Sequence, residues 1–113
     1  MSEKPSDAGV DLVVVTMRFR ANAVAQKAGT LAAVLSHYVV VTRGSEGCRN
    51  VDFCVSVADP RVFVVLQKWA SPASQEAHFN SAEMIGMAEA CNGLLCEAPQ
   101  IDLLEGISAH DLA

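Results

Sequence analysis

The side chain best suited to acid–base chemistry in this sequence is His78, which is followed directly by Phe79. An imidazole titrates near neutral pH, so it can accept a proton from a bound molecule and later return it. His78 is therefore the candidate catalytic residue. The alternative is a partly buried structural histidine that packs beside Phe79 and bonds to a backbone carbonyl.

Trp69 is the second residue with clear binding chemistry, and it ends an alternating run over residues 62–69. Its indole ring could stack on an aromatic ligand, and its N–H group could donate to an oxygen atom. A large core residue packed under the helices would give the same pattern. In a strand of this register Phe63, Gln67 and Trp69 share one face. The predicted substrate-binding residues are Trp69, Phe63, Gln67, Phe79 and Met84.

Met84 has its own alternative, because a methionine at helical spacing suits a helix core as well as an adaptable pocket wall. Arg43 is expected to complement a helix C-terminus and to pair with Glu46, rather than to bind substrate. His37 lies off the apolar stripe of its predicted helix, and His110 lies in the tail, so neither is a candidate.

The cysteines and the missing motifs bear on cofactors. Cys48, Cys54, Cys91 and Cys96 lack zinc-site spacing and are expected to be free thiols in a reducing compartment. The sequence contains no phosphate-binding glycine loop, nucleophile elbow or HExxH motif. We therefore predict no cofactor and no metal.

Composition excludes several classes of protein. The chain has 113 residues, which suits one domain, and 51% of them are apolar. The net charge of −5, with no basic cluster, disfavours binding to nucleic acid or to an anionic membrane. No apolar run is long enough to span a bilayer, and the N-terminus lacks a signal peptide. We expect a cytoplasmic protein.

The hydrophobic periodicity predicts alternating strands and helices. Residues 1–9 form a polar, disordered leader, residues 10–106 form the domain, and residues 107–113 form a tail. Within the domain a strand is expected over 10–20, and a helix capped by Asn22 runs to about Thr42. The remaining elements are predicted as strands over 48–57, 62–69 and 100–104, a helix over 72–79 that begins after Ser71, and a helix that begins at Asn80.

This β-α-β-β-α-β order predicts an α+β, ferredoxin-like fold with a four-stranded antiparallel sheet and helices on one face. The other face of such a sheet must also be covered, and a second copy of the chain is the simplest cover. Asn50 and Asp52 alternate onto the polar face of their strand and are expected to meet that partner subunit.

The stretch from Thr42 to Cys48, TRGSEGC, resembles the antibiotic biosynthesis monooxygenase family. The resemblance continues through Asp59-Pro60, Trp69 and the AHFNS stretch that contains His78, and it covers roughly residues 12–105. Four features depart from the family pattern. Gln67 stands where a glutamate is frequent, Val51 stands where a tyrosine is frequent, and the proline that precedes the Gly-Cys pair in the family is absent. Thr16, Met17 and Arg18 occupy the region where haem-degrading relatives use an asparagine. The last departure argues against haem degradation.

The resemblance implies a dimeric α/β barrel with a pocket between sheet and helices in each subunit. It also implies a cofactor-independent monooxygenase that oxidises a small aromatic phenol, quinol or polyketide with molecular oxygen, with His78 as the proton shuttle and Trp69 as a pocket wall. The alternative function is a non-catalytic, dimeric ligand-binding or stress-response protein. An open cavity shared by His78 and Trp69 would favour the enzyme, and a space filled by side chains would favour the alternative.

Overall fold

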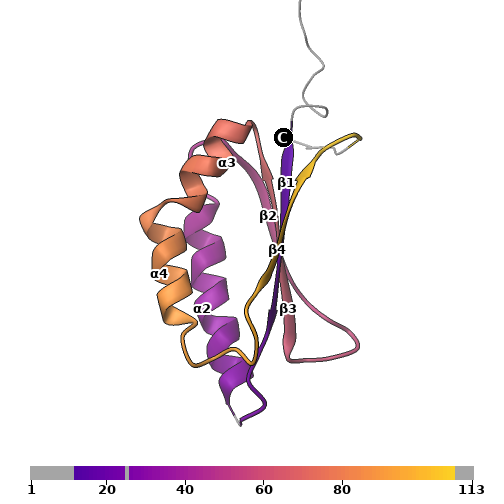
Figure 1. Ribbon diagram of the computed structural model, residues 1–113, viewed down its shortest axis with the longest axis vertical. Coiled ribbons are helices and arrows are strands. Elements are labelled where there is room, and N and C mark those ends of the chain that lie inside the picture. The colour runs from indigo at the N-terminus through magenta and orange to yellow at the C-terminus, as the bar shows by residue number, and fades with distance from the viewer. Residues whose placement is uncertain (1–11, 25, 109–113) are drawn as a thin grey trace, which may run out of the picture.

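The computed structural model describes residues 12–24 and 26–108, which form one sheet and one layer of helices (Figure 1). The predicted leader, the first residues of the predicted first strand, and His110 lie outside the described residues. The elements in chain order are β1 (Val13–Arg20), α2 (Lys27–Thr42), β2 (Cys48–Val55), β3 (Val62–Trp69), α3 (Pro72–Phe79), α4 (Ala82–Ala90) and β4 (Gln100–Glu105).

The four strands lie in the order β2-β3-β1-β4, and every neighbouring pair is antiparallel. All three helices cover the same face of this sheet (Figure 1). The predicted α+β, ferredoxin-like architecture is therefore confirmed. None of the helices in the described part of the chain is both long and apolar enough to cross a bilayer.

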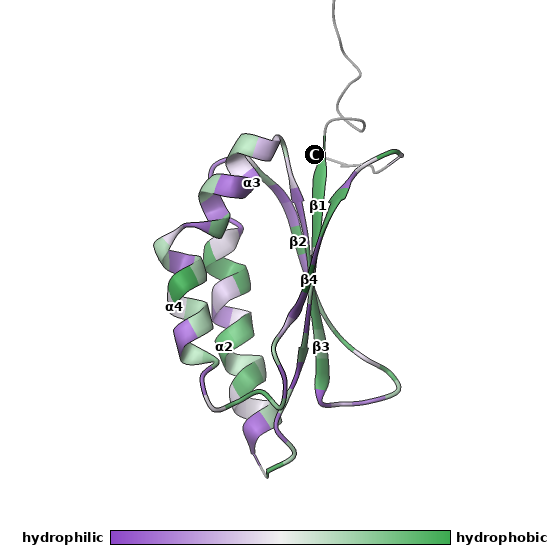
Figure 2. Cartoon of the chain, viewed as in Figure 1, coloured by the Kyte–Doolittle hydropathy of each residue, from purple (hydrophilic) through white to green (hydrophobic). Residues whose placement is uncertain are grey.

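The core lies between the sheet and α2, as the periodicity predicts. The buried residues of α2 are Leu31, Leu35, Tyr38, Val39 and Thr42, the stripe expected from helical spacing. On the sheet, β3 sends alternate side chains toward the helices, and β1 does the same in register with it. Figure 2 shows the resulting run of hydrophobic residues along β3 and the start of β1.

Two helix starts differ from the prediction. Helix α2 begins at Lys27 after Gln26, whose φ of 73° is left-handed, while the Asn22 side chain accepts from the Val24 amide and closes a local turn. Helix α4 is capped by Ser81, whose hydroxyl accepts from the Met84 amide, and Asn80 ends α3 instead. At α4 the adjacent Ser81 takes the capping role predicted for Asn80, whereas the Asn22 side chain is used in a turn before α2 and Gln26 makes no side-chain cap.

Strand β2 is shorter than the predicted 48–57 because the chain turns after Val55. The Ser56 hydroxyl accepts from the amides of Ala58 and Asp59, which starts the turn before β3. Arg20 then binds the Asp59 carboxylate at 2.7 Å. The other end of the sheet extends one residue further than expected, since β4 runs to Glu105.

Gly47 occupies a position that no other residue fits. Its φ is +82°, and an added Cβ would overlap the Cβ of Ser74. We expect Gly47→Ala to lower the free energy of unfolding by at least about 1–2 kcal/mol, the cost of a left-handed backbone alone. Gly29→Ala is the matched control, because nothing lies within 4 Å of its added Cβ and the residue is helical. The control should stabilise the protein by about 0.5–1 kcal/mol. Urea denaturation of both variants would measure this, and equal effects would contradict the assignment.

Candidate active site

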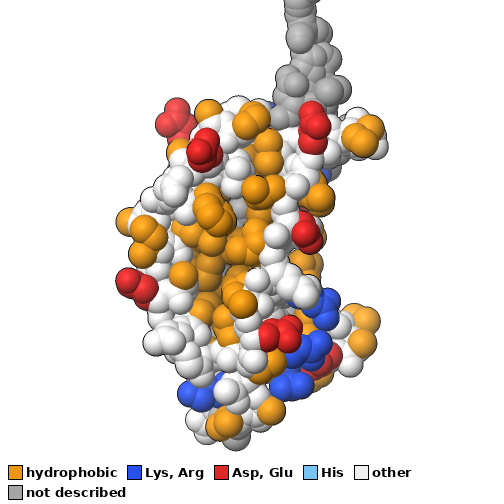
Figure 3. Space-filling view, in the orientation of Figure 1, with side chains coloured by type: hydrophobic (Ala, Val, Ile, Leu, Met, Phe, Trp, Pro, Cys, Tyr) orange, Lys and Arg blue, Asp and Glu red, His pale blue; other side chains and the backbone are white. Residues whose placement is uncertain are grey.

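A cavity of about 680 Å³ opens between α4, the segment that follows α4, and strands β1 and β4. Figure 3 shows hydrophobic side chains filling the hollow between the helix layer and the sheet. The lining residues that carry the argument below are Met17 and Phe19 from β1, Met84 and Met87 from α4, and Ile101 from β4. A cavity with such walls suits an apolar, flat ligand.

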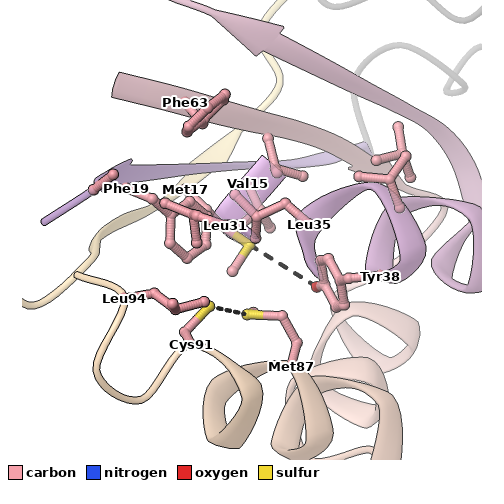
Figure 4. Close-up of a cluster of buried hydrophobic side chains, with 14 of the residues drawn as sticks. Val15, Met17, Phe19, Leu31, Leu35, Tyr38, Phe63, Met87, Cys91 and Leu94 are labelled. Atoms are coloured by element: carbon pink, nitrogen blue, oxygen red, sulfur yellow. Dashed lines mark hydrogen bonds between the residues drawn. The ribbon is translucent and has the colours of Figure 1, made fainter. Parts of the chain in front are cut away.

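The hydroxyl of Tyr38 lies directly behind two of these wall residues. Its oxygen is 3.9 Å from the sulfur of Met17 (Figure 4) and 3.5 Å from the sulfur of Met84. Tyr38 itself is only 2% exposed. Two thioethers therefore separate a buried hydroxyl group from the cavity.

A chain of buried hydrogen bonds leads to this hydroxyl from β3. The indole N–H of Trp69 donates to the amide oxygen of Gln67 at 2.9 Å. The amide nitrogen of Gln67 donates in turn to the Tyr38 oxygen at 2.8 Å. Because an indole N–H can only donate, Trp69 fixes which end of the Gln67 amide faces the tyrosine.

His78 completes the cluster from α3. Its Nε2 atom lies 2.7 Å from the Tyr38 oxygen, and its ring stacks on that of Trp69 with centroids 4.7 Å apart. The side chain is 6% exposed. Its second nitrogen, Nδ1, is buried and has no hydrogen-bond partner among the described residues. The Nδ1 atom of His78 is therefore a buried polar atom without a protein partner among the described residues.

Burial controls the protonation of both groups. Desolvation lowers the pKa of His78 below its ordinary 6.5, and the carboxylate of Glu83 opposes this only in part. Desolvation also raises the pKa of Tyr38 above 10.0, against the hydrogen bond from Gln67. At neutral pH the pair therefore consists of a neutral imidazole and a protonated phenol.

A polar recess of about 370 Å³ borders His78. It is formed by the end of α2, the loop that follows α2, and helices α3 and α4. His78 lines it, together with Ser45, Ser74, Ser81 and the carboxylates of Glu46 and Glu83. His78 therefore stands between a polar recess and the Tyr38 hydroxyl.

The lowered pKa of His78 makes stability depend on pH. Below about pH 6.5 the unfolded chain takes up the imidazole proton before the folded chain does, so acidification favours unfolding. We expect the free energy of unfolding to fall by up to about 1.4 kcal/mol per pH unit until the pH reaches the folded pKa. Urea denaturation at several pH values should show this slope reduced in His78→Gln and retained in His37→Gln, whose side chain is exposed. An unchanged slope in His78→Gln would contradict the assignment.

The structure brings together His78, Trp69, Gln67 and Met84 of the six predicted site residues. It separates the other two from them: Phe63 packs against Phe53, and Phe79 is 45% exposed on the helix surface. Trp69 is fully buried. None of the four main cavities among residues 12–24 and 26–108 is lined by both His78 and Trp69.

Tyr38 is the site residue that the sequence reasoning missed, because it was counted only as part of the apolar stripe of α2. One signal was available: Tyr38 is the only tyrosine in the chain, and it carries a hydroxyl group into an otherwise apolar stripe. A buried tyrosine hydroxyl requires a partner. Its partners come from β3 and α3, which local spacing does not reveal.

Other predicted contacts differ in detail. Arg43 donates to the carbonyl oxygen of Val51 at 3.0 Å, and the described residues show no ion pair between it and Glu46. The Asn50 amide donates to the Asp52 carboxylate at 3.2 Å on the exposed surface. No disulfide joins any of the four cysteines. In the part of the chain that the structure describes, no three metal-ligating side chains gather.

Comparison with known proteins identifies a family. A model of the antibiotic biosynthesis monooxygenase family matches residues 12–90, more than half of the chain. No curated protein matches the chain.

Solved structures show the same fold. The chain resembles Rv0793 from Mycobacterium tuberculosis, with 21% identity, a TM-score of 0.79, and 87% of this chain and 97% of that one covered. It also resembles PA3566 from Pseudomonas aeruginosa, with 21% identity, a TM-score of 0.78, and coverage of 88% and 98%. A third similar structure is NE2512 from Nitrosomonas europaea, a protein of unknown function, with 20% identity, a TM-score of 0.80, and coverage of 93% and 98%.

Proposed function

Because this chain belongs to the antibiotic biosynthesis monooxygenase family, we propose that it oxidises a small aromatic phenol, quinol or polyketide with molecular oxygen and without a cofactor. The observation that carries the proposal is the placement of the buried Tyr38–His78 pair directly behind the methionine wall of an apolar cavity. An apolar cavity with a proton-transfer pair at its wall supplies what such a reaction needs from the protein.

The cavity favours an uncharged substrate. Among the described residues that line it, the only formally charged side chain is Glu89, which is exposed. A neutral phenol can enter such a space, whereas an anion formed inside it is poorly solvated. The phenolate is therefore a strong electron donor toward oxygen, which is itself small and apolar.

Molecular oxygen is the only oxidant that the proposed reaction needs. Removal of the phenolic proton gives an electron-rich anion, which transfers one electron to O2, and the two radicals then join through a new C–O bond. The resulting peroxide takes up a proton, and its O–O bond breaks as the same carbon loses hydrogen. One oxygen atom becomes a product carbonyl, and the other leaves as water. The substrate loses two hydrogens and no other reductant is required.

Oxygen uptake by the purified, metal-free protein tests this function. Naphthoquinols and anthrones are suitable substrates, with His78→Ala beside the parent protein. His37→Ala is the matched control, because His37 is an exposed histidine on α2. Uptake above the autoxidation rate that is lost only in His78→Ala supports the proposal. Uptake that never exceeds autoxidation would overturn it.

The second candidate function is non-catalytic ligand binding with the same fold. The observation that favours it is the complete burial of Trp69, which lines none of the four main cavities in the described part of the chain. Quenching of Trp69 fluorescence by an aromatic ligand, without oxygen uptake, would support this alternative. Trp69 is the only tryptophan, so the signal has one source.

We also propose that two chains pair through their open sheet faces. Val14, Val64 and Leu66 are only partly buried on the face that the helices leave uncovered, and Leu104 is 48% exposed beside them. Covering such a face with a second copy buries these apolar side chains. Sedimentation at micromolar concentration should give a dimeric mass, and Leu66→Lys should shift it toward the monomer. A monomeric parent protein would contradict the proposal.

A further inference from the structure

We propose that Tyr38 and His78 form a two-way proton relay between the apolar cavity and the polar recess, and that Tyr38, rather than His78, meets the substrate. This inference rests on the proposed function, whose reaction must remove one proton from the substrate and later return one to the peroxide. It assigns a catalytic role to Tyr38 and a relay role to His78, with Gln67 and Trp69 as positioning residues.

The positions of the partners support this assignment. The Nε2 atom of His78 lies 2.7 Å from the Tyr38 oxygen, and the same oxygen contacts the sulfurs of Met84 and Met17, which line the cavity. Neither His78 nor Tyr38 lines that cavity itself. The Tyr38 oxygen contacts two of the wall residues, so the tyrosine hydroxyl gives the imidazole a proton path toward a ligand in the cavity.

The hydrogen bonds from Trp69 to Gln67 and from Gln67 to Tyr38 have a fixed direction. The Trp69 indole donates to Gln67, and the Gln67 amide donates to the Tyr38 oxygen, whichever form His78 takes. The Tyr38 oxygen is thus held in position, while its own proton remains free to point elsewhere. Gln67 and Trp69 position the hydroxyl without taking up its proton.

The hydrogen bond between Tyr38 and His78 can run in either direction. In one state the Tyr38 hydroxyl donates to Nε2 of His78, and the imidazole proton resides on Nδ1. In the other state Nε2 carries the proton and donates to the Tyr38 oxygen, and the tyrosine proton turns toward the sulfur of Met84 at 3.5 Å. The Nδ1 atom lacks a partner among the described residues in either state, so the protein itself does not fix the tautomer.

These two states correspond to the two proton transfers. In the first, a phenolic proton passes to the Tyr38 oxygen, the tyrosine proton passes to Nε2, and the Nδ1 proton leaves to the recess. In the second, Tyr38 donates to the peroxide, Nε2 returns a proton to Tyr38, and Nδ1 takes one from the recess. Each cycle restores both side chains, so no net charge accumulates on either.

The residues around the recess and around the cavity are suited to these proton transfers. On the recess side, the lining includes Glu46, Glu83 and three serines; none of them hydrogen-bonds to Nδ1, so a proton passes between Nδ1 and these groups through water or a side-chain movement. On the cavity side, Met17 and Met84 have flexible side chains, and a shift of their sulfurs would expose the hydroxyl to a ligand. The proposed proton path thus leads through the recess that His78 lines, and the substrate path leads through the cavity whose wall Tyr38 contacts.

Solvent exchange of the Tyr38 hydroxyl proton tests the relay without any substrate. The chain has one tyrosine, so ¹³C label at its ring carbon next to the hydroxyl gives a single NMR signal. In a mixture of light and heavy water, the relay predicts fast exchange and one averaged signal. In His78→Gln the exchange should slow until separate signals for the two isotopes appear, whereas His37→Gln should resemble the parent protein.

The outcomes separate the relay from the proposed function. Equal exchange in the parent protein and in a folded His78→Gln, or in His78→Asn if the first variant fails to fold, would overturn the relay. Oxygen uptake that survives Tyr38→Phe at the parent rate would also overturn it, while leaving the monooxygenase function intact. Slowed exchange in His78→Gln, with no oxygen uptake by the parent protein, would support the relay path and remove the proposed reaction.

Discussion

Tyr38→Phe should lower kcat for oxygen uptake by about 100-fold or more and leave KM nearly unchanged, the range expected when a general acid–base group is removed. The substitution deletes only the hydroxyl oxygen that joins Gln67, His78 and the methionine wall. The phenyl ring keeps its place in the core of α2. Steady-state oxygen uptake with a saturating quinol or anthrone measures the effect.

A double variant sharpens this prediction. If Tyr38 and His78 transfer protons as one unit, Tyr38→Phe combined with His78→Gln should be about as slow as either single variant. If the loss of kcat in the double variant equals the product of the two single losses, the two residues act separately. If the melting temperature of Tyr38→Phe equals that of the parent protein, the lost activity does not reflect lost structure.

Trp69→Ala should be among the most destabilising single changes in the chain, lowering the free energy of unfolding by about 3–5 kcal/mol. Trp69 is fully buried at the end of β3, stacks on His78 and donates to Gln67. Its removal leaves a cavity and also leaves the Gln67 carbonyl without its indole donor. The expected loss is a large fraction of the stability of a domain of this size.

Val57→Ala is the control for Trp69→Ala, because the Val57 side chain is fully exposed. Its effect should stay within about 0.5 kcal/mol, as for most surface substitutions. Urea denaturation followed by far-UV circular dichroism suits both variants, since one of them lacks the tryptophan. Similar losses in the two variants would show that Trp69 is not the core residue that its burial indicates.

The fold was predictable because its signals are local. The alternation of Phe63, Val65 and Trp69 with their neighbours reports which face of β3 is buried, and the spacing along α2 reports its stripe. Helix starts were less predictable, since Ser81 and Asn80 are adjacent and both can cap. Only tertiary contacts decide between such neighbours.

The site was predictable only in part, because its geometry joins distant segments. Tyr38 meets Gln67 across 29 positions and His78 across 40, and no periodicity reports such pairings. His78, Trp69 and Gln67 could be selected by residue type, since each carries a polar group suited to binding or catalysis. Their actual arrangement makes Trp69 and Gln67 supports for a tyrosine, which residue type alone does not indicate.

The most direct test of the central claim is the fate of ¹⁸O2 during turnover of an anthrone by the purified, metal-free protein. The proposed reaction predicts one ¹⁸O atom in the new product carbonyl and one in water, at a rate well above autoxidation and lost in Tyr38→Phe. Product that forms no faster than in buffer, or at the same rate with Tyr38→Phe, would contradict the account of the site.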